Sequence, residues 1–156
     1  MSNYVTEALG RALLDLMREK SIEKITVDEL TTRAKLGRAT YFRNFNAKEE
    51  IITQYIVMRW RAYEKAHRLK EHRIDDPYRV RRYFEFCLSM RADNDVIMRQ
   101  NRSSAILSAY EIIFYPDSVK LTAPNRQKSQ QEGTIPADNK EQASHPTGAK
   151  NNSRKR

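Results

Sequence analysis

The chain has 156 residues, with 29 lysines and arginines against 20 aspartates and glutamates, which gives a formal net charge of +9. Its hydrophobic content of 39% is enough for one or two small domains. A single cysteine excludes an internal disulfide framework and fits a reducing compartment. No apolar run reaches the length of a membrane-spanning helix or of a signal peptide. We therefore expect a cytoplasmic protein with no membrane contact.

Apolar residues recur at helical spacing, and no segment alternates as a strand would, so the sequence predicts an all-α fold. The first helix is expected over residues 5–17, which place seven apolar side chains on one face. A long helix is expected over about 47–72, after the segment 25–46. Three shorter helices should follow over residues 77–88, near 96–99 and over 106–114, with Pro116 closing the last one.

Capping signals divide the segment from residue 25 to residue 52 into short helices. Thr26 and Glu29 have the spacing of a capping box, in which the hydroxyl accepts the Glu29 amide proton and the carboxylate reaches back. Ile25 and Leu30 occupy the positions of a hydrophobic staple. The helix that begins here should end near Ala34.

A tight turn and a second short helix are expected next. Gly37 should supply the turn, the second helix should span residues 38–45, and Asn46 should cap the long third helix. This order predicts a helix-turn-helix, which presents one helix to the DNA major groove. Between Leu30 and Lys48 there are five basic residues and no acidic one, as phosphate contact requires.

The segment resembles the DNA-binding domain of the tetracycline-repressor (TetR) family over residues 8–55. The residues that carry the resemblance are Ile25, Thr26, Val27, Asp28, Glu29, Leu30, Arg33, Ala34, Thr40, Phe45, Lys48 and Glu49. Several positions depart from the family pattern. Lys35 replaces the usual turn glycine, Gly37 the usual serine, Ala39 a common glycine and Asn44 a common histidine, and Phe42 stands at the family's tyrosine position.

The resemblance implies a DNA-binding role for ten residues, which are Thr26, Gly37, Arg38, Ala39, Thr40, Tyr41, Phe42, Arg43, Asn44 and Lys48. Arg38 and Thr40 would face base edges, and Ala39 would approach a thymine methyl group. Thr26 and Lys48 would contact phosphate. The side chains at 41, 43 and 44 would reach phosphate or base edges. Phe42 either contributes to DNA binding or packs between the short helices, and packing is expected for Phe45.

The resemblance also implies a DNA-binding domain over 1–52 and a helical effector and dimerisation region over 53–115. The composition separates a tail over 116–156 from these two regions. An effector pocket would be lined by Tyr83, Phe84, Cys87, Met90, Met98, Tyr110 and Phe114. Aromatic and methionine residues at this spacing also suit an ordinary core, and that alternative stays open. The effector cannot be named from the sequence.

The tail over 116–156 has no aromatic residue and only three large aliphatic ones, so its composition predicts a disordered, basic segment. The family closes its second domain with two further helices that build the dimer interface, and the tail offers no candidate for them. Either the chain ends early, or dimerisation uses the helices before Pro116.

These features predict a dimeric DNA-binding regulator, a ligand-responsive repressor acting on a palindromic operator in double-stranded DNA. Two alternatives stay open: a DNA-binding helical module controlled by a protein partner, and a truncated regulator that dimerises weakly. We expect no enzyme activity and no cofactor, because the sequence has no local Ser-His-Asp arrangement and no glycine-rich phosphate-binding loop. We expect no metal, because His67, His72 and His145 lack metal-ligand spacing.

Overall fold

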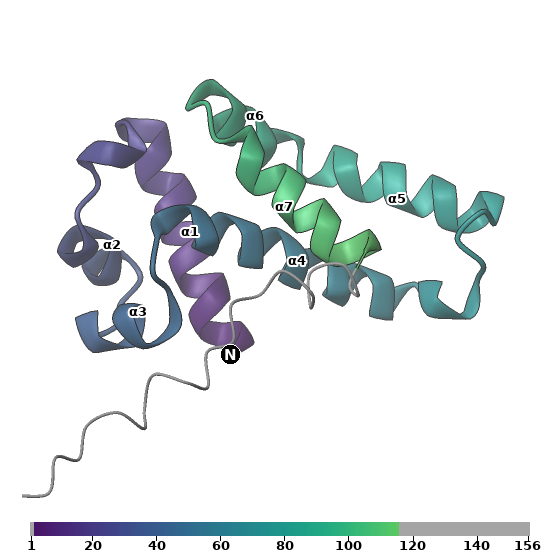
Figure 1. Cartoon of the computed structure of the whole chain (residues 1–156), viewed down its shortest axis with the longest axis horizontal. Helices are drawn as coiled ribbons and strands as arrows, with labels where there is room; N and C mark the ends of the chain where they lie inside the picture. The colour runs from purple at the N-terminus through teal and green to yellow at the C-terminus, as the bar shows by residue number, and fades with distance from the viewer. Residues whose placement is uncertain (1, 116–156) are drawn as a thin grey trace, which may run out of the picture. The chain divides into compact units, whose positions relative to one another are not determined.

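In a computed structural model, residues 2–115 are described, and their regular structure is entirely helical (Figure 1). The helices are α1 (Asn3–Glu19), η1 (Ile22–Lys24), α2 (Val27–Arg33), α3 (Arg38–Asn44), α4 (Lys48–Ala66), η2 (Leu69–Glu71), α5 (Pro77–Ser89), α6 (Arg91–Arg99) and α7 (Ser103–Phe114). The predicted all-α fold is confirmed for these residues. The expected tail and the role given to Pro116 lie outside them.

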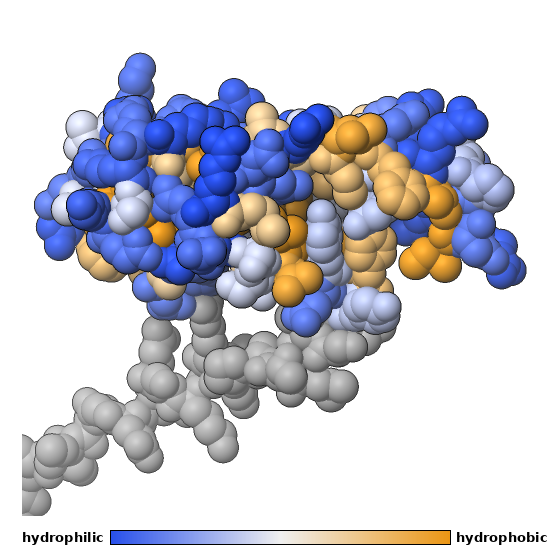
Figure 2. All heavy atoms as spheres, turned by 90° about the horizontal axis from the view of Figure 1, so that it is seen from above, coloured by the Kyte–Doolittle hydropathy of each residue, from blue (hydrophilic) through white to orange (hydrophobic). Residues whose placement is uncertain are grey.

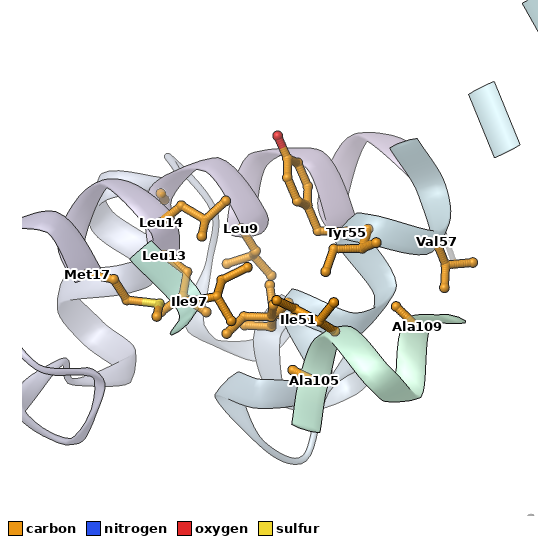
Figure 3. Close-up of a cluster of buried hydrophobic side chains, with 14 of the residues drawn as sticks. Leu9, Leu13, Leu14, Met17, Ile51, Tyr55, Val57, Ile97, Ala105 and Ala109 are labelled. Atoms are coloured by element: carbon orange, nitrogen blue, oxygen red, sulfur yellow. The ribbon is translucent and has the colours of Figure 1, made fainter. Parts of the chain in front are cut away.

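The core is organised around α4, on which both α1 and α7 pack. The apolar stripe of α1 buries Leu9 and Leu13 completely, and α4 contributes Ile51 to the same cluster (Figure 3). A buried hydrogen bond of 3.1 Å from the Thr53 hydroxyl to the Ala105 carbonyl joins α4 to α7. Helix α4 packs against both α1 and α7. The expected domain boundary between residues 52 and 53 therefore falls inside one continuous helix.

Glycine at position 10 lets α1 and α4 approach closely. A Cβ atom at Gly10 would lie 2.4 Å from Cδ2 and 2.6 Å from Cγ of the Tyr55 ring. In Figure 3 the Tyr55 ring lies against α1. The crossing of the two helices therefore depends on a missing side chain, and this crossing sets the position of the segment that follows α1.

Two helix limits differ from the sequence-based expectations. Ala47, and not Asn46, is the N-cap of α4, and Glu50 reaches back to accept the Asn46 backbone N–H at 3.0 Å. The long helix ends at Ala66 and not near residue 72, because Arg68 takes a left-handed conformation (φ 53°) and starts η2. The chain is thereby reversed towards α5.

Helix α5 begins as expected. Pro77 is its first residue, and the Asp76 carboxylate accepts the Tyr78 backbone N–H at 2.8 Å. A hydrogen bond from His72, followed by the one from the Tyr78 backbone, holds the pKa of Asp76 below its ordinary value. Helix α6 is longer than the expected segment 96–99. None of the helices in residues 2–115 is long and apolar enough to cross a membrane.

Candidate nucleic-acid interface

The start of α2 has the predicted cap. The Thr26 hydroxyl accepts the Glu29 backbone N–H at 3.2 Å, and Ile25 and Leu30 are both buried in the core. The Glu29 carboxylate pairs with the Lys20 ammonium at 2.6 Å. This contact is the main cause of the lowered pKa of Glu29, and the Thr26 backbone N–H contributes to it. The capping interactions thus fix where α2 starts, with Thr26 exposed at its N-terminus.

The turn between α2 and α3 is built around Lys35, which is a correction to the expected role of Gly37. Lys35 has a φ of 54°, in the left-handed region that favours glycine. Gly37 has an ordinary extended conformation (φ −74°, ψ 146°) and is the N-cap of α3, without a side chain to accept a hydrogen bond. The Leu36 backbone N–H donates to the Thr31 carbonyl at 2.9 Å and closes the turn.

Helix α3 has one buried face and one exposed face. Tyr41 and Phe45, one turn apart, are buried, with exposed fractions of 4% and 2%. The exposed face carries Arg38, Ala39, Phe42 and Arg43.

The adjacent aromatic residues have opposite environments. Tyr41 was expected to reach phosphate or base edges, but its ring packs in the core. Burial there raises the pKa of its hydroxyl. Phe42 is 57% exposed, so the alternative in which it packs between the short helices is wrong. The two rings meet edge to face at a centroid distance of 5.1 Å.

Two contacts fix the position of the Arg38 guanidinium on the exposed face of α3. Its guanidinium donates to both Asp28 carboxylate oxygens, at 2.9 and 3.1 Å, and its Cζ lies 5.4 Å from the Phe42 ring centroid. Both members of the ion pair are exposed. Exposed ion pairs contribute about 0–1 kcal/mol, so a stronger ligand can displace Asp28.

Thr40 and Asn44 lie at the edge of this face, and both are half-buried. The Asn44 side-chain amide donates to the Thr40 carbonyl at 2.7 Å, within α3. Arg43 and Lys35 form no ion pair with any residue in the described part of the chain. Their charges are therefore available to a ligand on this side of α3.

Lys48, which the resemblance assigns to a phosphate contact, forms hydrogen bonds within the molecule. The Lys48 ammonium donates to the Ile25 carbonyl at 2.8 Å and also to the Ile22 carbonyl. These carbonyls lie at η1 and just before α2, so Lys48 ties the first residue of α4 to the segment that leads into α2. It positions the short helices from within the molecule.

Gln100 at the end of α6 holds the same segment from the other side, a role that the sequence does not reveal. Its Oε1 accepts the Ile22 backbone N–H at 2.7 Å, and its Nε2 donates to the Lys20 carbonyl at 2.9 Å and to the Met17 carbonyl. These partners are about eighty residues away along the chain. No local motif could have indicated such contacts.

The seven residues expected to line an effector pocket do not line one cavity. Met98 is 56% exposed on α6, Met90 is fully buried in the core, and the Cys87 thiol lies 4.0 Å from the Tyr110 hydroxyl. An apolar groove of about 280 Å³ lies between α4, α5 and α7. It is lined by Trp60, Ile74, Arg79, Val80, Tyr83, Phe84 and Phe114, three of which were expected.

No group of three or more histidine, cysteine or acidic side chains in residues 2–115 is arranged to bind a metal ion. Comparisons with protein-family models, with curated proteins and with solved structures find no match to this chain.

Proposed function

We propose that this chain is a sequence-specific, DNA-binding transcriptional regulator of the tetracycline-repressor type, in which α2, the turn and α3 form the helix-turn-helix. The observation that carries the proposal is the exposed face of α3. Two guanidinium groups, a small side chain and an apolar ring lie together on this face, while Tyr41 and Phe45 anchor the helix from behind. Such a face suits the major groove, where arginine pairs with guanine and small apolar groups contact thymine methyls.

The backbone at positions 35 and 37 supports the proposal independently. The family pattern has glycine at position 35 and serine at position 37, whereas this chain has lysine and glycine. Lys35 has the left-handed conformation that glycine adopts without strain, and Gly37 stands at an N-cap, which serine favours. The backbone thus has the conformations that the family residues would prefer, although the residues themselves have changed.

Arg38 is the side chain proposed to read a base. A bidentate contact of arginine with guanine O6 and N7 discriminates by about 1–3 kcal/mol, more than an exposed ion pair contributes. DNA would therefore displace Asp28 from Arg38. Lys35 and Arg43 would contact phosphate on either side of it. Thr26 would offer the positive N-terminus of α2 to a phosphate.

The functional unit is proposed to be a homodimer on a palindromic operator, with recognition helices in successive major grooves, roughly 34–36 Å apart. Repression released by a small molecule is the proposed mode of regulation. The apolar groove next to Trp60 is the candidate effector site. Its volume of about 280 Å³ is close to the lower end of ligand pockets, which is about 300 Å³, so the groove suits only a small apolar ligand.

Selection of binding sites from random duplexes tests the proposal, followed by affinity measurements on the selected site and on random DNA. Arg38→Ala should weaken binding to the selected site by about 10–100-fold and relax one base position. Arg43→Ala should weaken binding to both duplexes about equally and lower the salt dependence by about one phosphate contact.

Arg73→Ala is the matched control, because it removes the same charge from the exposed connection between α4 and α5. It should leave both affinities unchanged. If no sequence were enriched, or if Arg38→Ala and Arg73→Ala behaved alike, α3 would not be the recognition helix.

A further inference from the structure

Thr6 on α1 is a buried polar side chain without a partner. Its exposed fraction is 4%, and its hydroxyl forms no hydrogen bond with any residue in 2–115. The other buried polar side chains of this part of the chain are satisfied. Thr31 and Thr53 donate to main-chain carbonyls, and Glu64 pairs with Arg79. Because buried polar groups in folded proteins nearly always have a partner, the Thr6 hydroxyl indicates a ligand from outside the chain.

The small surface that Thr6 retains lies in the wall of a pocket between α1 and α4, with a volume of about 410 Å³. Thr6 precedes Gly10 by one turn of α1, so the pocket opens beside the close contact of Gly10 with Tyr55. Its volume lies within the range of ligand pockets, which is about 300–1,000 Å³. The pocket shares no residue with the groove next to Trp60, and it is separate from the apolar surface over α5–α7 that Figure 2 shows.

Two cations and no carboxylate line this pocket. Arg61 and Lys65 lie one turn apart on α4, so both side chains can reach the same anion. Neither forms an ion pair or a hydrogen bond with a residue in the described part of the chain. The same holds for the side-chain amides of Asn3 and Gln54, which also line the pocket. The polar part of the lining is therefore positively charged and has donors available.

The N-terminus of α1 lies at this pocket as well. Asn3 is the first residue of this 17-residue helix, its N-cap Ser2 gives no side-chain hydrogen bond, and its first turn has no acidic residue. The free backbone N–H groups and the helix dipole add to the positive potential there. The helix end, the two cations and the Thr6 hydroxyl thus favour the same kind of ligand, an anion.

The remaining lining is apolar and indicates what the anion is attached to. Three of the eight lining residues are Val57, Met58 and Ala62. An inorganic anion would leave these side chains uncovered, whereas an apolar body would pack on them. If each non-hydrogen atom takes roughly the 30 Å³ of a water molecule, the pocket holds about a dozen such atoms.

We propose that this pocket binds a small organic carboxylate with an aliphatic or aromatic body. Arg61 and Lys65 bind the carboxylate, Thr6 donates its hydroxyl proton to it, and the body packs on Val57 and Met58. The inference goes beyond the proposed function, because this site involves neither DNA nor the groove next to Trp60.

Isothermal titration calorimetry of the full-length chain without DNA tests the inference, with 4-phenylbutyrate and octanoate as two separate probes. Each carboxylate should bind with a dissociation constant of about 0.1–1 mM, as expected for a ligand of this size. The corresponding amides have nearly the same shape but no charge, and they should bind at least about tenfold more weakly. Absence of binding of both carboxylates at about 10 mM, or equal binding of the amides, would overturn the inference.

Thr6→Val separates a ligand contact from a structural role, because valine keeps the shape of threonine and removes the hydroxyl. This variant should bind the carboxylates about 5–10-fold more weakly, and without ligand its Tm should rise, since a buried hydroxyl without a partner is lost. A lower Tm with unchanged affinity would show that Thr6 serves the fold and would overturn its assignment to the ligand.

Arg61→Gln combined with Lys65→Gln should reduce the affinity for the carboxylates to that of the amides. Arg91→Gln is the matched control, since Arg91 is an exposed arginine on α6, and it should leave the affinity unchanged. Phe84→Ala, in the groove next to Trp60, shows which of the two cavities is occupied. Binding that is lost in Phe84→Ala and kept in the double variant would place the ligand in that groove and overturn the inference. Circular dichroism verifies the helical content of every variant.

Discussion

Replacement of Gly10 by alanine should destabilise the chain through a single contact between α1 and α4. The added Cβ would lie 2.4, 2.6 and 2.8 Å from Cδ2, Cγ and Cβ of Tyr55. Rotation about the first side-chain torsion of Tyr55 would move its ring away but would leave its Cβ in place. The two helices would therefore have to separate, and the short helices α2 and α3 depend on their crossing.

The expected magnitude follows from two opposing effects. Alanine in a helix interior is favoured over glycine by about 1 kcal/mol. Overpacking of a close helix contact costs about 1–3 kcal/mol, and the upper end applies because one clashing atom is fixed to the α4 backbone. The net loss should be about 2 kcal/mol. For an ordered region of this size it corresponds to a fall of about 8 °C in Tm.

Urea unfolding followed by circular dichroism measures this loss. A double-mutant cycle with Tyr55→Gly identifies its cause, because all three clashing atoms are then absent and the cost of Gly10→Ala should disappear. If Gly10→Ala left the chain as stable as the wild type or more stable, or if its cost were the same in both backgrounds, the close approach of α1 to α4 would be refuted.

Three further changes test other parts of the chain. Lys35→Gly combined with Gly37→Ser should stabilise the chain by about 1 kcal/mol. Glycine at position 35 removes the strain of a left-handed lysine, and serine at position 37 adds a side-chain N-cap to α3. A lower Tm than that of the wild type would contradict this prediction. Gln100→Ala should lower the free energy of unfolding by about 1–3 kcal/mol, because it leaves the Ile22 N–H and two carbonyls without their partner. Gln100→Glu should lower it at least as much, because a carboxylate oxygen would replace the Nε2 donor opposite the Lys20 and Met17 carbonyls. A loss below about 0.5 kcal/mol in either variant would argue against these contacts. The lowered pKa of Asp76 means that its contribution to stability is present above its ordinary pKa of 3.8 and is lost as the pH falls through the lower folded value. Asp76→Asn should therefore show a shallower loss of Tm below about pH 4 than the wild type, and parallel curves for the two proteins would show that Asp76 is not protected in this way.

Local signals in the sequence were sufficient for most helix limits. Thr26 marks the start of α2 and Asp76 with Pro77 the start of α5, because capping needs only residues within about four positions of one another. The same reasoning failed at Asn46, where Glu50 bonds the backbone N–H and the cap moves to Ala47. Two local patterns competed there, and the sequence does not rank them.

Site residues were harder to place than helices. The sequence located α3 and its basic side chains, but it did not separate the environments of Tyr41 and Phe42. A helix of seven residues has too few turns for an apolar stripe to reveal its buried face. The family resemblance gave Lys48 a phosphate contact, but it could not show that the Lys48 ammonium donates to main-chain carbonyls more than twenty residues away.

By itself, the sequence determined that residues 2–115 are all helical and where most of their helices begin, because helical periodicity and capping act over one or two turns of chain. The tertiary structure alone decided which side of α3 is exposed, that Lys35 takes the left-handed turn position, and that Gly10 sets the crossing of α1 and α4. These outcomes depend on the packing of segments far apart in the chain, and packing is governed by shape and excluded volume, which a linear pattern of residue types does not encode.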